Sequence, residues 1–457
     1  MNLMRTKPIN ADLQGDSGLK RCLTALDLVL LGIGAIIGAG IFVLTGVAAA
    51  TYTGPAIMIS FVIAGFACAF SALAYAELAA LVGGCGSAYG YSYAGFGEIM
   101  AWIIGWDLIL EYGVATSAVA IGWSGYVNNA LAAMGIALPS EFLKAPAEGG
   151  LLNLPAAGII LILATLLAVG VHHSARFNAI MVAIKLLAIF IFIGVGAFHV
   201  DVANWSPFAP FGWSGIVSGA AIIFFAYIGF DAVSTAAEEA RDPARDLPKG
   251  ILGSLIVCTL IYMLVAALLT GIVPYTALNS ASPVADALLR IGHPWAAGLV
   301  AAGAIAGLTT VMLVLYYGLT RIFLAMSRDG LLPPVFAVVN TQTKTPIRII
   351  VGSGLCMSLI AGLTPIGDVA ELVNIGTLAA FAMVCAGVLM LRYTKPELPR
   401  PFKLPLMPYI PILGIIFCLY LMTGLPLITW LRFTLWLGIG MVIYFLYSHR
   451  NSALQRS

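Results

Sequence analysis

The sequence predicts an all-α integral membrane protein with twelve transmembrane helices. Three observations support this fold class. Hydrophobic residues make up 61% of the chain and charged residues only 9%, whereas a soluble domain carries roughly a quarter. The apolar residues form long runs, and a helix needs ~17–25 such residues to cross a bilayer. Lys and Arg gather in alternate loops between these runs, as the positive-inside rule requires.

Pro, Gly and charged residues bound twelve apolar runs. The third and eighth runs are long enough to tilt or to extend beyond the bilayer. The polar stretch before the first run has no feature of a cleavable signal peptide. The expected spans are 27–50, 56–82, 98–129, 155–171, 176–199, 214–238, 249–273, 295–326, 347–363, 368–392, 409–428 and 430–448.

The distribution of basic residues predicts the orientation of the chain. With the N-terminus inside the cell, eighteen of the 22 Lys and Arg residues fall in cytoplasmic segments. Only Lys144, Arg290 and Arg432 fall outside, and Lys185 lies within a span. We therefore expect a multi-pass protein of the cell membrane, with a cytoplasmic N-terminal segment at 1–26 and a cytoplasmic tail at 449–457.

The first apolar run is interrupted by Gly38-Ala39-Gly40. In hydrocarbon every backbone amide must find a partner, so non-helical backbone survives only where it is buried or lines a cavity. A Gly-rich interruption within a span is therefore a candidate binding site built from main-chain groups. The alternative is that Gly32, Gly38 and Gly40 are small residues that let neighbouring helices pack closely.

A second interruption, from Phe224 to Asp231, lies in the sixth run. Because five spans separate the two interruptions, the first and sixth spans cross the membrane in opposite directions. Two broken helices of opposite direction, each at the start of five spans, are typical of an inverted repeat. We expect a first repeat at 27–199 (helices 1–5), a second at 214–392 (helices 6–10), and two C-terminal helices at 409–448.

Broken helices expose half-helix ends in the middle of the bilayer. The half-helix that starts near Gly40 offers free N–H groups and a positive dipole end, which suit a carboxylate. The half-helices that end near Ile36 and Phe225 offer free carbonyls, which suit an ammonium. Both polarities together fit a zwitterion, of which a free α-amino acid is the commonest. We also expect that a Cβ at Gly38 or Gly40 would intrude on a bound carboxylate.

Several segments carry recognisable motifs. They are Gly-Ile-Gly-Ala-Ile-Ile-Gly-Ala-Gly-Ile-Phe at 32–42, Phe-Phe-Ala-Tyr-Ile-Gly-Phe-Asp-Ala-Val-Ser at 224–234, the loops 238–248 and 327–333, and Gly-Trp-Asp-Leu-Ile-Leu-Glu-Tyr at 105–112. Together they resemble the amino acid–polyamine–organocation (APC) superfamily over about residues 20–430. The last motif is similar to the cationic amino acid transporter branch and its bacterial relatives. The resemblance implies the LeuT-type 5+5 inverted-repeat fold. It also implies secondary transport of L-amino acids, neutral or cationic or both, by alternating access.

The resemblance also implies a set of substrate contacts in the two broken helices. The α-carboxylate contacts fall on the backbone amides of Gly38, Ala39 and Gly40. The α-amino contacts fall on the carbonyls of Ile36, Phe225, Ala226 and Ile228, and the ring of Phe225 would cap the substrate. Some members have a hydroxyl residue at the position of Ala39, and here the backbone amides must act without it.

Lys185 lies about nine residues, or roughly 13 Å, past the expected start of the fifth span, near the middle of a ~30 Å core. A lysine at this depth must be paired, rest on carbonyls or lose its proton. In sodium-coupled relatives a cation bridges spans 1 and 8, and the resemblance implies that the Lys185 ammonium replaces it near the span 1 break. We expect proton-coupled uptake with Lys185 as the coupling residue. The alternative is a snorkelling or structural lysine.

Carboxylates at membrane depth form a second group of candidates. Asp107 and Glu111 lie one turn apart on the third span and share a face. Glu111 is expected to line the substrate path, where it would favour a cationic side chain, and Asp107 either titrates or caps polar groups. Asp231 either takes part in proton coupling or caps the second half-helix of span 6. Glu77 is expected to be structural.

Other functional classes find little support in the sequence. No catalytic motif is recognised, so the chain is not expected to be an enzyme, and no cofactor is implied. The net charge of +2 argues against nucleic acid as a partner. The cysteines form no CxxC, and His172 and His173 lack a third ligand, so no metal is expected. Half-helix ends of mixed polarity suit a discrete ligand better than a channel. The closest alternative is an exchanger or facilitator without proton coupling, and a small accessory membrane subunit is left open.

Overall fold

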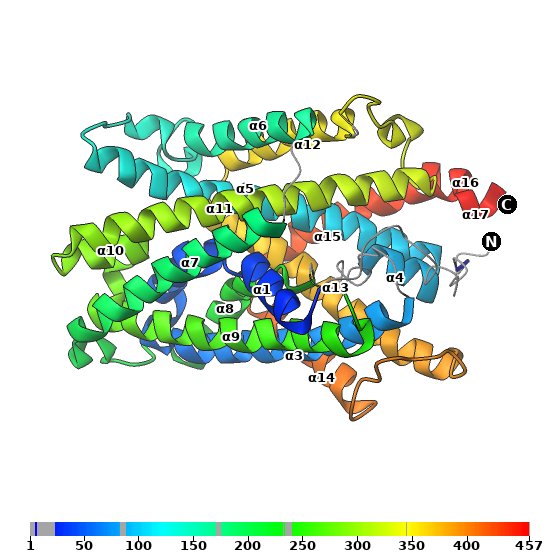
Figure 1. Cartoon of the computed structure of the whole chain (residues 1–457), viewed down its shortest axis with the longest axis horizontal. Helices are drawn as coiled ribbons and strands as arrows, with labels where there is room; N and C mark the ends of the chain where they lie inside the picture. The colour runs from blue at the N-terminus through cyan, green and yellow to red at the C-terminus, as the bar shows by residue number, and fades with distance from the viewer. Residues whose placement is uncertain are drawn as a thin grey trace.

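The computed structural model describes residues 5–6, 23–82, 88–170, 175–231, 233, 240–343 and 345–456. In this part of the chain the regular structure is helical, apart from one isolated bridge between Leu23 and Ala240. Long helices run side by side along the molecule (Figure 1). The all-helical class predicted from the sequence is therefore confirmed.

The two ends of the helical bundle carry different segments of the chain. Helix α10 (Pro283–Arg290) lies at one end, on the left of Figure 1, which we call the α10 end. Both chain termini lie at the other end, where the helices that carry Arg328 and Arg392 finish. We call this the arginine-rich end.

The helices are bounded mostly by Pro, Gly and short polar turns. Helix α1 (Ala25–Ile36) begins with a capping box, in which the Thr24 hydroxyl accepts from the Asp27 amide and the Asp27 carboxylate accepts from the Thr24 amide. The other principal helices are α3 (Ile57–Val82), α4 (Ala88–Gly95), α5 (Glu98–Ala133), α6 (Leu154–Val169), α7 (Ala175–Gly196), α8 (Gly212–Ile223), α9 (Pro243–Ile272), α11 (Pro294–Arg328), α12 (Ile347–Leu363), α13 (Ile366–Thr394), α14 (Tyr409–Thr423) and α15 (Leu427–Ile443). Short helices α16 (His449–Asn451) and α17 (Ala453–Arg456) end the chain.

Seven helical stretches of the described chain are long and apolar enough to cross a membrane. They are Gly40–Leu81, Glu98–Ala132, Ala179–His199, Arg245–Ile272, Pro294–Arg328, Ile366–Thr394 and Leu427–Asn451. The first of these contains a turn at Gly54, whose φ of +61° favours glycine. Five shorter apolar helices fall where the sequence predicts spans 1, 4, 6, 9 and 11; they are Ala25–Ile36, Leu154–Val169, Gly212–Tyr227, Ile347–Leu363 and Tyr409–Thr423.

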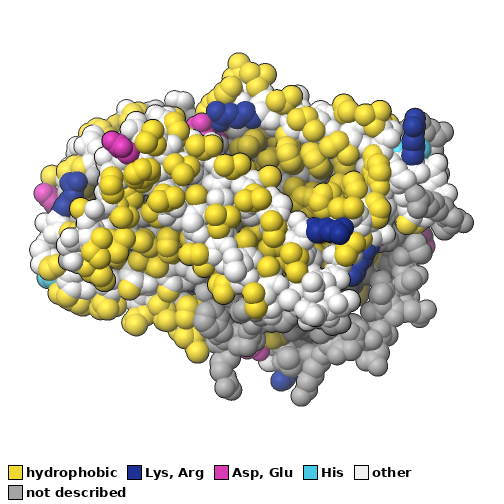
Figure 2. All heavy atoms as spheres, turned by 90° about the horizontal axis from the view of Figure 1, so that it is seen from above, with side chains coloured by type: hydrophobic (Ala, Val, Ile, Leu, Met, Phe, Trp, Pro, Cys, Tyr) yellow, Lys and Arg dark blue, Asp and Glu magenta, His cyan; other side chains and the backbone are white. Residues whose placement is uncertain are grey.

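The outer surface is apolar. On the face seen in Figure 2, the described surface carries many hydrophobic side chains and few charged ones. Leu187 and Phe190 on α7 and Leu431 and Leu435 on α15 are each more than half exposed. Large apolar residues exposed in this number would aggregate in water, whereas lipid tails accommodate them. The chain is a multi-pass membrane protein.

Helices α1 and α8 lie in the middle of the bundle (Figure 1). Helix α9 packs against α1 and α3, and α5 packs against α11 and α13. Helices α6 and α12 form an outer pair, and α14 and α15 both pack on α13. The short central helices α1 and α8 are therefore surrounded by longer helices.

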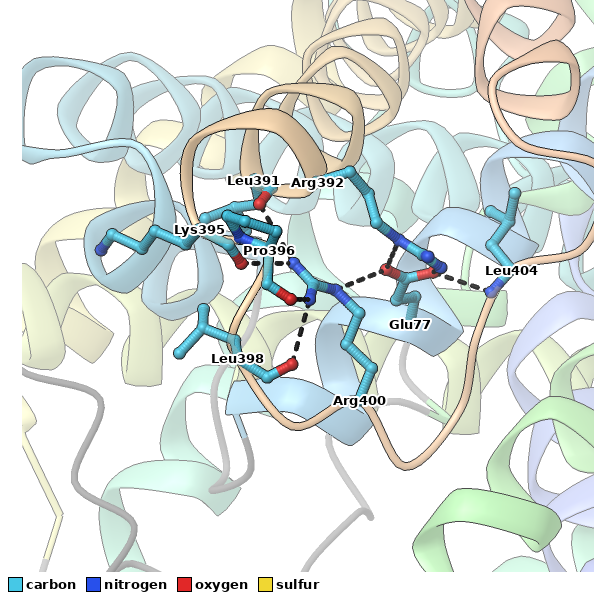
Figure 3. Close-up of polar contacts among 8 residues, drawn as sticks. All are labelled: Glu77, Leu391, Arg392, Lys395, Pro396, Leu398, Arg400 and Leu404. Carbon is cyan, nitrogen blue, oxygen red and sulfur yellow. Dashed lines mark hydrogen bonds and ion pairs between the residues drawn. The ribbon is translucent and has the colours of Figure 1, made fainter.

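Glu77 joins three segments at the arginine-rich end (Figure 3). Its carboxylate accepts from the Nε and Nη2 atoms of Arg392 on α13, at 2.8 and 2.7 Å, and pairs with Arg400 at 3.4 Å. It also accepts from the Leu404 amide at 2.7 Å. Because Glu77 lies on α3 and is 2% exposed, it ties α3 to α13 and to the segment before α14. The prediction that Glu77 is structural is confirmed.

Candidate substrate site at two helix breaks

Helix α1 stops in the middle of the bundle. It ends at Ile36, and Ile37 adopts an extended conformation (φ −72°, ψ 102°). Helical structure resumes with a π-helical turn, Gly40–Leu44, and a short helix, Thr45–Ala48. Among the described residues, no carbonyl accepts a hydrogen bond from the amides of residues 38–40. The predicted interruption is confirmed, and it leaves unpartnered N–H groups at the start of a half-helix.

The second break follows α8. This helix ends at Ile223 and continues as a 3₁₀ turn, Phe224–Tyr227, before Ile228 becomes extended (φ −60°, ψ 136°). Gly229 follows with a φ of +110°, a conformation that side chains rarely allow. The second predicted interruption is therefore also present. Residues 234–239, where the sequence places the rest of span 6, lie outside the described residues.

The two breaks pack directly against each other. A Cβ on Gly40 would lie 2.3 Å from the Cα of Ala226, and a Cβ on Gly229 would lie 2.8 Å from the Ala35 carbonyl oxygen. The expected reason for glycine at position 40, room for a ligand carboxylate, was therefore wrong, because Ala226 already fills that space. At Gly38 a Cβ would make an ordinary contact, 3.6 Å from Val311. Close helix packing, the alternative explanation, accounts for Gly40.

Lys185 holds the end of α1. Its Nζ lies 2.5 Å from the carbonyl oxygen of Gly34 and 3.1 Å from that of Ile37, and the side chain is 1% exposed. On α11, a Cβ at Gly307 would lie 2.5 Å from the Lys185 Cγ and Cδ atoms, so glycine leaves room for the lysine stem. The expected contact between the ammonium and carbonyls near the span 1 break is present.

Two polar side chains that the sequence analysis missed complete the breaks. The Tyr262 hydroxyl, on α9, lies 3.0 Å from the Ile36 carbonyl and 2.9 Å from the Ala226 carbonyl. A hydroxyl has one proton, so it donates to one of these oxygens at a time. The Asn374 amide, on α13, donates to the carbonyls of Ala221 and Ile222 near the end of α8, both at 2.8 Å. The sequence signal was weak, because each is a polar residue in an apolar span that also contains others, such as Thr259 and Thr377.

The buried carboxylates lie beside the breaks. Asp231 accepts a hydrogen bond from the Tyr112 hydroxyl at 2.8 Å, which links the second break to α5. Glu111 is 2% exposed and lies near Thr377, within electrostatic range of Asp107 and Asp231. Both Asp107 oxygens are buried and have no hydrogen-bond partner among the described residues. The structure thus groups the three carboxylates.

A small cavity of about 20 Å³ separates the two breaks from α5 and α11. From the two breaks, the cavity is lined by Ala35, Ile36, residues 38–40, Phe225 and Ile228. Its side-chain wall is apolar, with Ala115 and Val119 from α5 and Val311 and Leu315 from α11. Glu111 and Ala226 do not line this cavity. The space therefore combines free main-chain groups with an apolar wall.

Different features lie on the two sides of this cavity. A larger cavity of about 550 Å³ opens toward the α10 end, and Val43 and Gly122 line it next to the breaks. At the arginine-rich end, the Tyr89 hydroxyl donates to Asp329 at 2.7 Å, and the Arg241 amide donates to the Leu23 carbonyl at 2.9 Å. Glu238 and Glu239 of the same loop lie outside the described residues. In the described part of the chain, the larger cavity thus lies on the α10 side, and these two hydrogen bonds join segments on the arginine-rich side.

The comparisons with known proteins decide the family. The model of the amino acid permease family matches residues 23–446. The chain belongs to the amino acid permease family. This permease is 51% identical to the branched-chain amino acid permease of Bacillus subtilis, over 97% of this chain and 96% of the relative. It is 47% identical to the methylthioribose transporter of the same organism, over the whole of both chains.

More distant relatives include the human cationic amino acid transporter 4, which is 38% identical over 87% of this permease and 64% of the relative. The family and these relatives are transporters, so this permease is a transporter and not an enzyme. In the described part of the chain, no group of three or more His, Cys, Asp or Glu side chains could hold a metal ion.

Proposed function

We propose that this permease imports small and branched apolar L-amino acids by alternating access, driven by protons. One observation supports this best: unpartnered amides and nearby carbonyls share a cavity whose side-chain wall is apolar. The charged head of an amino acid suits the main-chain groups, and an aliphatic side chain suits Ala115, Val119, Val311 and Leu315. The name of the branched-chain amino acid permease agrees with this substrate class.

In the proposed complex, the substrate carboxylate accepts from the amides of residues 38–40, at the positive end of the half-helix. The substrate ammonium donates to the carbonyls at residues 36, 225, 226 and 228, and the ring of Phe225 covers the bound molecule. Tyr262 orders two of these carbonyls, since its hydroxyl lies within 3.0 Å of both. A cavity of about 20 Å³ is smaller than an amino acid, so binding requires the breaks to move apart.

Lys185 is the proposed coupling residue. When protonated, its ammonium donates to the Gly34 and Ile37 carbonyls and fixes the end of α1. When the proton leaves, a neutral amine holds these carbonyls less strongly, and α1 is free to move. Asp231 is the proposed second proton site, because its contact with Tyr112 joins the second break to α5.

The proposed architecture is the LeuT-type arrangement of twelve spans, with repeats at 27–199 and 214–392 and two added helices at 409–448. The opposite directions of α1 and α8 support it, because α1 begins at the arginine-rich end and α8 at the α10 end. The arginine-rich end, with both termini, would face the cytoplasm, and the cavity at the α10 end would face the exterior.

Uptake by the purified protein in vesicles tests this function. Labelled leucine should accumulate when the vesicle exterior is more acidic than the interior, and a protonophore should abolish the accumulation. Unlabelled valine and isoleucine should compete strongly, and arginine and methylthioribose weakly. Competition by methylthioribose but by no amino acid would refute the proposed substrate. Uptake that needs internal amino acid, whatever the pH gradient, would instead identify an exchanger.

A cationic substrate is the second candidate, because Glu111 is a buried carboxylate near the breaks. If arginine competes better than leucine, Glu111→Gln should weaken arginine uptake and spare leucine uptake. If the substrate is apolar, as proposed above, Glu111→Gln should change leucine uptake and arginine uptake to the same extent.

A further inference from the structure

Two histidines that are far apart in the sequence meet at the α10 end. His199 follows the last turn of α7, and His293 immediately precedes α11. Their Nε2 atoms lie 3.3 Å apart, within hydrogen-bond distance of each other, and their rings form a near-perpendicular pair with centroids 4.9 Å apart. The His199 side chain is exposed and the His293 side chain is half-buried. Nothing in the transport site described above uses them.

The environment of His199 leaves one of its nitrogens ready to act as a ligand. Its Nδ1 lies 3.0 Å from the Val195 carbonyl oxygen, one helical turn earlier. A carbonyl only accepts, so Nδ1 must carry the proton and Nε2 must present a lone pair in the neutral ring. The same pattern, one ring nitrogen on a carbonyl and the other on the ion, orients most metal-binding histidines.

The spacing of the two Nε2 atoms suits a tetrahedral metal ion. Zinc binds histidine nitrogen at ~2.0–2.1 Å, so two such ligands at a tetrahedral angle lie about 3.3–3.4 Å apart. The observed 3.3 Å falls in this range. We propose that His199 and His293 bind a divalent transition-metal ion of the zinc and copper class, and that solvent water fills its remaining positions. Imidazole suits these ions, whereas magnesium and calcium prefer oxygen ligands.

The pair belongs to the interface that also holds Lys185. Along α7 and α11, Lys185 lies against Gly307, Ala188 lies against Gly303, and the histidines meet at the end of the same antiparallel register. Lys185 and His199 are fourteen residues apart, or about 21 Å along a helix. A bound ion would thus link the outer ends of two helices whose middle holds the proposed coupling residue. The metal site itself does not depend on the proposed function.

Metal titration of the full chain tests the proposal. The protein is purified without a histidine tag, exchanged into metal-free buffer, and titrated with Zn²⁺ by calorimetry and with Cu²⁺ by electron paramagnetic resonance. We expect one saturable site per chain, nitrogen coupling in the copper spectrum, and tighter binding of Cu²⁺ than of Zn²⁺. Acidic buffer should weaken binding, because protons compete for the same lone pairs. Mg²⁺ should not compete.

Variants at all five histidines make the assignment specific. His199→Gln and His293→Gln should each reduce zinc affinity at least tenfold. The matched controls, His449→Gln and the double variant H172Q/H173Q, should bind as the parent does. Size-exclusion chromatography checks that each variant is folded. Full zinc affinity in both H199Q and H293Q would overturn the proposal, as would loss of binding only in the control variants.

Discussion

At both helix breaks a side chain donates to carbonyls of the half-helix, but the two donors differ chemically. Each half-helix ends inside the bundle, where a side chain from another helix donates to carbonyls of its last turn. At the end of α1 the donor is the ammonium of Lys185, which contacts Gly34 and Ile37. At the end of α8 it is the neutral amide of Asn374, which contacts Ala221 and Ile222. Only the first of these donors can gain or lose a proton.

In the proposed proton-coupled mechanism, this difference indicates which of the two breaks responds to protons. A hydrogen bond to a charged group contributes about 1.5–3 kcal/mol, and a neutral one about 1 kcal/mol. Deprotonation of Lys185 would therefore weaken the hydrogen bonds to the α1 carbonyls. The free-energy change is comparable to a tenfold change in an equilibrium constant. No proton transfer can change the hold of Asn374 on α8. We infer that α1 moves in response to protonation, whereas α8 stays fixed.

The largest effect is expected from removing the ammonium. Lys185→Met keeps the length of the side chain but leaves the Gly34 and Ile37 carbonyls without a donor. Accumulation of leucine driven by a pH gradient should be abolished in vesicles. Lys185→Gln, which gives the α1 break a neutral amide like that of Asn374, should restore exchange of internal for external leucine but not accumulation. If either variant still concentrates leucine against a gradient, Lys185 is not the coupling residue.

The contact between the breaks gives the next largest effect. Gly40→Ala places a Cβ 2.3 Å from the Ala226 Cα, where backbone cannot yield easily. Overpacking of this kind costs about 1–3 kcal/mol or more, so leucine uptake should fall at least tenfold. Gly194→Ala on α7 is the matched control, since a Cβ there would meet no atom within 4 Å, and uptake should stay within about threefold. Equal damage from the two variants would show that the contact with Ala226 is not what requires glycine.

A substitution at the α8 break should affect the stability of the protein rather than proton coupling. Asn374→Leu removes the donor to two α8 carbonyls at nearly constant volume, which should lower the free energy of unfolding by about 1–3 kcal/mol. The thermal unfolding midpoint in detergent should therefore fall. The dependence of uptake on the pH gradient, corrected for the amount of folded protein, should not change. An altered pH dependence would mean that α8 also takes part in the switch.

Much of this architecture could be predicted from local sequence patterns. The apolar runs, the Gly38-Ala39-Gly40 interruption and the position of Lys185 are readable because lipid forbids unpaired backbone and unpaired charge. The side chains that hydrogen-bond to the breaks could not be predicted in this way. Tyr262 contacts the carbonyl of Ile36, which is 226 residues away in the sequence, and Asn374 contacts carbonyls 152 and 153 residues away. A polar residue in an apolar helix does not reveal such a partner.

The same limit applies to the steric role of glycine and to the histidine pair. The sequence analysis assigned the space beside Gly40 to a ligand because the approach of Ala226 depends on how two distant segments pack. His199 and His293 are 94 residues apart, so no local spacing marks them as a pair. Packing between helices determined both outcomes, and local pattern contains little information about it.

The smallest expected effect concerns the group that the two breaks share. The Tyr262 hydroxyl lies within 3.0 Å of carbonyls from both breaks, Ile36 and Ala226, and these carbonyls are proposed to bind the substrate ammonium. Each carbonyl has a second lone pair, so the hydroxyl can position it without excluding the ammonium. Tyr262→Phe keeps the ring, which packs against Phe61 and Tyr227. Losing one neutral hydrogen bond, about 0.5–1.5 kcal/mol, should weaken apparent leucine affinity about two- to tenfold.

This variant also separates positioning from competition. If Tyr262 positions the carbonyls, the apparent KM for leucine rises, the maximal rate changes little, and the dependence on the pH gradient remains. Tyr227→Phe is the matched control, because its hydroxyl donates to the Phe61 carbonyl at 2.9 Å and contacts neither break carbonyl. A lower KM in Tyr262→Phe would mean that the hydroxyl competes with the substrate for Ile36 and Ala226. The shared group would then keep the two breaks closed until the ammonium displaces it.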